Sequence, residues 1–102
     1  MSDANDALVA ALQAGAAAVE RCRDAPADQA KKAFGDAMIR IIAARNDRIH
    51  ALTPGADDQE LPRVNALLSV MSSIEFPLAG FHRERLDEVD QALHALLSGA
   101  CA

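Results

Sequence analysis

Residues 61–81 read LPRVNALLSVMSSIEFPLAGF, and this stretch decides the fold. Its large apolar residues recur at steps of three and four, which is the period of one face of an α-helix. The apolar row consists of Leu61, Val64, Leu67, Leu68, Met71, Ile74 and Leu78. Near the end of the stretch stands Pro77. Because a proline inside a helix removes a hydrogen bond and clashes with the preceding turn, we expect the helix to break or bend sharply there.

A row of small polar residues runs beside the apolar row and is predicted to be buried. Serine hydroxyls in a helix can donate to a carbonyl one turn earlier, and their small size lets another helix approach closely. Glu75 lies among apolar residues just before the predicted bend, so we expect its carboxylate near the core with an arginine partner. The candidate buried polar residues are therefore Glu75, Asn65, Ser69 and Ser72. The candidate arginine partners of Glu75 are Arg40, Arg45, Arg48 and Arg83.

Three more helical segments are predicted around this stretch. The first has a thin apolar face of small residues around Gly15, which allows a neighbouring helix to come close. Pro26 suits the first position of the second helix, because its missing N–H would have no partner there. The acidic loop before residue 61 offers carboxylates that can cap the third helix. The expected helices cover residues 3–23, 26–52, 61–76 and 78–98, the last two separated by a proline bend at Pro77.

The second helix is predicted to bury a single apolar row. That row consists of Ala30, Phe34, Met38, Ile41, Ile42, Ile49 and Leu52. Arg45 and Arg48 fall close to it, and we expect their stems to lie along its edge with the charged heads in water.

The chain has 102 residues, which is enough for one helical domain with a modest core. Many of its apolar residues are alanines and it has no Trp or Tyr, so burial must come from Leu, Ile, Val, Met and Phe. No stretch alternates in the manner of a β-strand. We therefore expect an all-α protein with four helical segments in a bundle. A second copy could cover a face that one small chain leaves open, so we expect a homo-oligomer.

The charge pattern excludes some classes of partner. The net charge is −5 and no block of lysines or arginines exists, so we expect neither nucleic-acid binding nor binding to an anionic membrane. The apolar run at residues 8–19 is too short to span a membrane and follows acidic residues, unlike a signal peptide. Cys22 and Cys101 have neither metal-pair spacing nor the density of a disulfide scaffold. A cytoplasmic protein is expected.

His82 is a candidate phosphoacceptor, because phosphorelays use a histidine on a four-helix bundle. A phosphotransfer domain should follow that histidine with lysine and small residues. In this chain the residues after His82 are Arg83, Glu84 and Arg85. Their long side chains crowd the histidine, and the carboxylate of Glu84 would repel a phosphoryl group. A surface histidine in the first turns of a helix is the favoured interpretation, and phosphotransfer through His82 is the alternative.

Other catalytic and metal-binding patterns are weak or absent. Asp47 and His50 have the spacing of the Glu-x-x-His pairs in di-iron bundles, but no second pair accompanies them. The chain has no G-x-S-x-G elbow and no glycine-rich phosphate loop. We therefore predict no catalytic residue, no metal and no cofactor. A small ligand- or metal-binding bundle that uses Glu75, Asp47 and His50 is a second alternative.

The segment around the predicted bend gathers bulky apolar residues where helical regularity is lost. Its members, Phe76, Pro77, Leu78 and Phe81, form the candidate interaction surface. With amphipathic helices throughout and no catalytic constellation, the sequence favours a non-catalytic helical interaction protein: an adaptor, a regulator or a small chaperone. Its expected partner is a protein, either a second copy or another helical chain.

Overall fold

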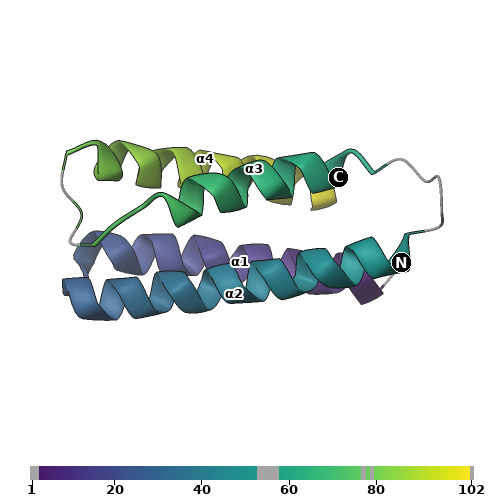
Figure 1. The fold of residues 1–102 in the computed structure, drawn as a ribbon, viewed down its shortest axis with the longest axis horizontal. Coiled ribbons are helices and arrows are strands. Elements are labelled where there is room, and N and C mark those ends of the chain that lie inside the picture. Colours follow the sequence, from purple (N-terminus) through teal and green to yellow (C-terminus); the bar gives the residue numbers. More distant parts are fainter. Residues whose placement is uncertain (1–2, 53–57, 77, 79, 102) are drawn as a thin grey trace.

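The structure, a computed structural model, describes residues 3–52, 58–76, 78 and 80–101. They form four α-helices joined in an all-α bundle, which confirms the predicted fold class (Figure 1). The helices are α1 (Asp3–Asp24), α2 (Ala27–Ala51), α3 (Glu60–Ser72) and α4 (Phe81–Cys101). The first two lie within about two residues of their expected bounds. In contrast, α3 ends at Ser72, before the expected end at residue 76. Helix α4 begins at Phe81 and ends at Cys101, whereas residues 78–98 were expected.

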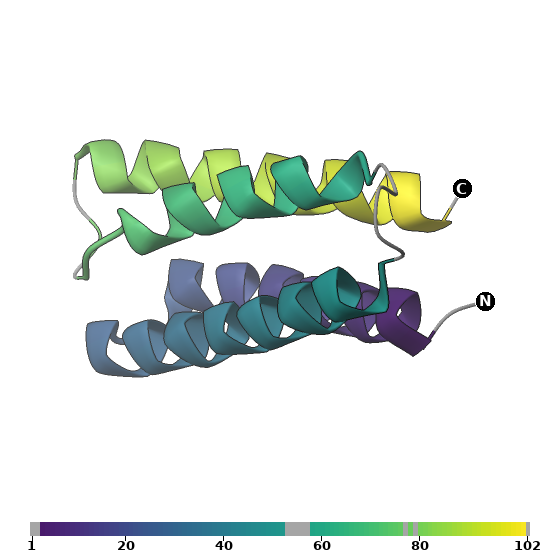
Figure 2. The ribbon, with the colours of Figure 1, turned by 45° about the vertical axis from the view of Figure 1, so that its right-hand side comes forward.

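Each helix runs antiparallel to the helices beside it, and the order around the bundle follows the order in the chain (Figures 1 and 2). The most extensive contact joins α1 to α2, and the least extensive joins α2 to α3. The start of α1 and the end of α4 lie at one end of the bundle. The α1–α2 connection and the segment between α3 and α4 lie at the other end.

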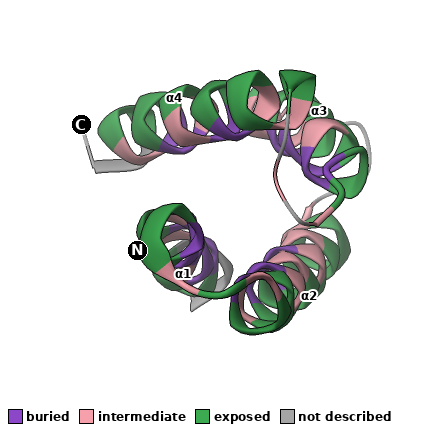
Figure 3. Cartoon of the chain, turned by 90° about the vertical axis from the view of Figure 1, so that its left-hand side faces the viewer, coloured by how far each residue is buried: buried purple, intermediate pink, exposed green. Residues whose placement is uncertain are grey.

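Buried residues line the inner sides of all four helices, as Figure 3 shows in end view. The side chains with the least exposure are Leu8, Leu12, Val19, Ile41, Val64, Leu67, Met71, Val89, Leu93 and Leu96. Gly15 lies in the middle of this core. A Cβ atom at Gly15 would be 3.1 Å from Leu93 Cδ2 and 3.2 Å from Ile41 Cδ1, so α1, α2 and α4 meet closely there. The face of small residues predicted for the first helix therefore allows α2 and α4 to pack closely against α1.

An acidic residue caps the start of α3, as expected from the loop sequence. Asp58 Oδ1 accepts hydrogen bonds from the backbone N–H groups of Glu60 at 2.9 Å and Leu61 at 3.3 Å. The same carboxylate pairs with Arg48, whose Nε lies 2.6 Å from Asp58 Oδ2. Arg48 is therefore held by an ion pair, and its head does not simply extend into water as predicted.

The end of α3 is set by serines upstream of the proline. Ser72 Oγ donates to the carbonyl of Ser69 at 2.9 Å, and Ser73 Oγ donates to that of Val70 at 2.7 Å. These bonds to the preceding turn, which the sequence predicted, satisfy carbonyls that a continuing helix would otherwise use. The proposed bend at Pro77 lies outside the described residues. Before α4, Gly80 adopts a φ of 56°, which favours glycine.

Candidate functional site

The described residues of the predicted interaction surface differ in how far they are buried. Phe76 is half-buried and packs edge-on against Phe34, with ring centroids 5.7 Å apart. Leu78 also packs against the core. Phe81 is 57% exposed and lies at the start of α4. Pro77 lies outside the described residues. Phe76 and Leu78 are thus half-buried at the end of the core while Phe81 is exposed, and the role of these residues as an interaction surface stays a prediction.

The predicted burial of the small polar row beside the apolar row of α3 was wrong. Asn65, Ser69, Ser72 and Glu75 are all exposed. They lie on the flank of α3 beside its buried row, where the contact with α2 is sparse. Periodicity identified a separate face correctly, but none of the other described helices covers it. The described partner of Asn65 is Arg45 of α2, whose Nη1 donates to Asn65 Oδ1 at 3.2 Å.

A hydrogen bond of His82 connects the segment after α3 to the start of α4. Its Nδ1 accepts a hydrogen bond from the backbone N–H of Glu75 at 3.3 Å. Its ring lies 4.2 Å from that of Phe81, centroid to centroid, and the guanidinium of Arg85 covers the Phe81 ring at 5.6 Å. These contacts give His82 a structural role, and its role as a phosphoacceptor stays a prediction.

An apolar surface on α2 was missed by the sequence reasoning. Ile39 is 64% exposed and Ile49 is 45% exposed, whereas Ile49 was predicted to be buried. Half-buried Met38 and Ile42 and the glycine at position 35 continue this surface. We call these five residues, Gly35, Met38, Ile39, Ile42 and Ile49, the α2 outer row. The signal was available, because positions 35, 42 and 49 are separated by seven residues, the repeat of a coiled-coil seam.

The α2 outer row borders the exposed polar flank of α3. A cavity of about 430 Å³ opens between the two helices near Gly35. Its lining includes Phe34, Gly35 and Met38 from α2, Met71 and Ser72 from α3, and Phe76 beyond α3. Nothing in the described part of the chain lies within 4 Å of a Cβ built at Gly35. The site therefore combines an exposed apolar row, a small polar flank and a hollow between them.

Two ionisable side chains away from this surface, those of Asp58 and Cys22, have pKa values shifted by their surroundings. The hydrogen bond from Arg48 and those from the backbone N–H groups hold the pKa of Asp58 below its usual range. Burial raises the pKa of the Cys22 thiol, which lies where α1 approaches α2. Asp47 and His50 are both exposed, and the described residues contain no cluster of three His, Cys, Asp or Glu side chains that could hold a metal ion.

Comparisons with protein-family models, curated proteins and solved structures give no match to this chain. Among the described helices, none has both the length and the apolar character needed to cross a membrane.

Proposed function

We propose that this chain is a non-catalytic helical interaction protein that forms a homodimer through the α2 outer row. One observation carries the proposal: Ile39, at the centre of α2, leaves 64% of its surface in water. A large aliphatic side chain gains roughly 1.5–3 kcal/mol when it is fully buried. Together with Ile49 and the hollow beside Gly35, this exposure supports a docked helix.

A second copy of α2 fits this row better than an unrelated partner, because the row can face itself. If two α2 helices cross antiparallel with Ile42 at the two-fold axis, position 35 of one copy lies opposite position 49 of the other. Each Ile49 would then face the hollow at Gly35 of the second copy, as a knob enters a hole. Such a contact is self-complementary, which is the requirement for a two-fold dimer.

The surface area of the single chain supports the same conclusion. The chain exposes 6185 Å², whereas a compact monomer of its mass, 10.8 kDa, exposes about 5,500 Å². The difference of roughly 700 Å² is comparable to the area, near 800 Å², that each partner buries in a standard protein interface.

Sedimentation equilibrium of the wild-type chain and of Ile39→Lys tests the proposal. We expect the wild type to have twice the mass of the chain, and Ile39→Lys to have the mass of one chain because a buried lysine opposes docking. Gln29→Lys is the matched control, since it adds the same charge to an exposed position of α2 away from the row. Circular dichroism should show the same helix content in all three proteins. A monomeric wild type, or a dimeric Ile39→Lys, would contradict the proposal.

A further inference from the structure

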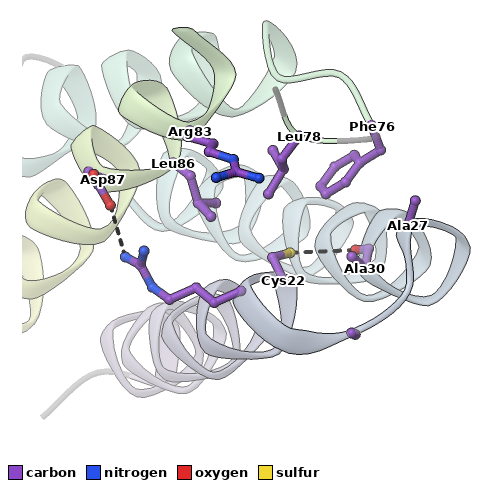
Figure 4. A pocket seen from close by; sticks show the side chains of 10 residues that line it. Cys22, Ala27, Ala30, Phe76, Leu78, Arg83, Leu86 and Asp87 are labelled. Atoms are coloured by element: carbon purple, nitrogen blue, oxygen red, sulfur yellow. Dashed lines mark hydrogen bonds and ion pairs between the residues drawn. The ribbon is translucent and has the colours of Figure 1, made fainter. Parts of the chain in front are cut away.

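A second cavity lies at the end of the bundle where α1 meets α2, away from the start of α1 and the end of α4 (Figure 4). Its volume is about 460 Å³, which falls within the range of small-molecule sites. Most of its wall is apolar. The apolar side chains come from three directions: Ala27 and Ala30 from α2, Phe76 and Leu78 from the segment after α3, and Leu86 from α4.

The charged side chains around this cavity are not equivalent. Arg23 and Asp87 neutralise each other, with Arg23 Nη2 3.1 Å from Asp87 Oδ1. Arg23 also lies 3.5 Å from Asp90 Oδ2. Arg83, by contrast, makes no side-chain hydrogen bond or ion pair with any described residue. Figure 4 shows its guanidinium extended over the cavity, beside Leu86 and Leu78.

We propose that this cavity binds a small organic carboxylate with an apolar body. The carboxylate would accept two parallel hydrogen bonds from the Arg83 guanidinium, a geometry that arginine favours. The apolar body would lie against Phe76, Leu78 and Leu86. An uncharged ligand would gain no ion pair with the exposed guanidinium, and a short anion would leave the apolar wall in water. The combination selects a molecule with both features, such as a medium-chain fatty acid.

Isothermal titration calorimetry with octanoate tests the proposed ligand class. We expect saturable binding of octanoate, and much weaker binding of octan-1-ol, which has the same chain without the charge, and of acetate, which lacks the chain. Arg83→Gln should weaken octanoate binding about tenfold or more, because it removes a charge-assisted hydrogen bond. Arg63→Gln is the matched control: Arg63 is also exposed but belongs to α3 and does not line the cavity. Binding of octan-1-ol as tight as that of octanoate, or equal losses in the two variants, would overturn the proposal.

The thiol of Cys22 provides a second readout that locates the ligand. Cys22 lines the cavity, and its Sγ donates to the carbonyl of Ala30 at 3.6 Å. In a Cys101→Ser background, bound octanoate should slow the reaction of Cys22 with N-ethylmaleimide. The protection should saturate at the octanoate concentration found by calorimetry and should be reduced in Arg83→Gln. If octanoate binds without changing the reaction rate of Cys22, the ligand lies elsewhere and the assignment of this cavity is wrong.

Discussion

Gly15 lies where α1, α2 and α4 come closest, and a side chain there would meet atoms with little room to move. Its nearest neighbours would be Leu93 Cδ2 at 3.1 Å and Ile41 Cδ1 at 3.2 Å, and both of these residues are fully buried. Gly35 also lies within a helix, but nothing described lies within 4 Å of a Cβ built there. Alanine substitutions at the two glycines therefore distinguish the effect of helix propensity from the effect of core packing.

We predict opposite effects of alanine at these two positions. Measured in the Ile39→Lys background, where the proposed dimer contact at Gly35 is blocked, Gly35→Ala should stabilise the fold by about 1 kcal/mol, because alanine favours the helix over glycine by that amount. Gly15→Ala gains the same propensity but forces an added methyl group into a close-packed core, which costs roughly 1–3 kcal/mol, so it should be neutral or destabilising by up to about 2 kcal/mol. Urea denaturation measures both changes in the free energy of unfolding. Equal stabilisation by the two substitutions would contradict this prediction, because it would show that the side chains of Leu93 and Ile41 can move aside with no loss of stability.

At the scale of one element, α3 depends on a carboxylate that precedes its first turn. Asp58 receives hydrogen bonds from Arg48 and from two backbone N–H groups, and its side chain is 6% exposed. These bonds favour the ionised form, so the pKa of Asp58 is lower in the folded chain than in the unfolded chain. The stabilisation is therefore fully present above the unfolded pKa, near 3.9, and is lost as the pH falls through the lower folded pKa.

Asp58→Asn should lower the free energy of unfolding at neutral pH by about 2 kcal/mol, the size expected for hydrogen bonds to a charged group. Below about pH 4 the difference from the wild type should shrink, because the wild-type carboxyl becomes protonated first in the unfolded chain and, at lower pH, in the folded chain. Urea denaturation across this pH range measures the effect. Asp36→Asn, which removes a carboxylate from an exposed position of α2, is the control. A difference that stays constant with pH would show that the charge of Asp58 does not act as described.

The elements also show what the sequence could predict. Pro26 and the acidic loop placed the starts of α2 and α3 to within about two residues, because caps and prolines act locally. The end of α3 was placed too late. There the serine hydroxyls bond to the last carbonyls, and the packing of Phe76 on Phe34 favours a chain that has left the helix. That packing joins residues far apart in the sequence, so a local pattern does not reveal it.

The candidate site was missed for a related reason. Apolar residues occur on two sides of α2, and the predicted buried row included Ile49 with the core-facing residues and left Ile39 unassigned. The structure separates Ala30, Phe34 and Ile41, which face the core, from the exposed Ile39 and Ile49. Periodicity assigns residues to a face, but which face is covered depends on where α1 and α3 pack. The cavity beside Arg83 needs three separate segments to be brought together, so no single motif could have indicated it.

At the scale of the whole molecule, dimer formation and ligand binding should appear separately in thermal stability. Anything that binds only the folded chain stabilises it by mass action. The melting temperature of the wild type should therefore rise with protein concentration, because the proposed dimer couples folding to association. That of Ile39→Lys should be independent of concentration, since a lysine in the proposed contact opposes docking and position 39 is largely exposed in the single chain. Differential scanning calorimetry at several protein concentrations measures both.

Octanoate then distinguishes the two proposed surfaces. Ile39 does not line the cavity beside Arg83, so octanoate should raise the melting temperature of monomeric Ile39→Lys as it does that of the wild type at low concentration. Arg83→Gln should show the reverse pattern, with a melting temperature that rises with protein concentration but responds little to octanoate. Phe76 lines both this cavity and the hollow near Gly35, so it is the residue through which the two sites could influence each other. If Ile39→Lys also loses the response to octanoate, the cavity is complete only in the dimer, and the two sites are one.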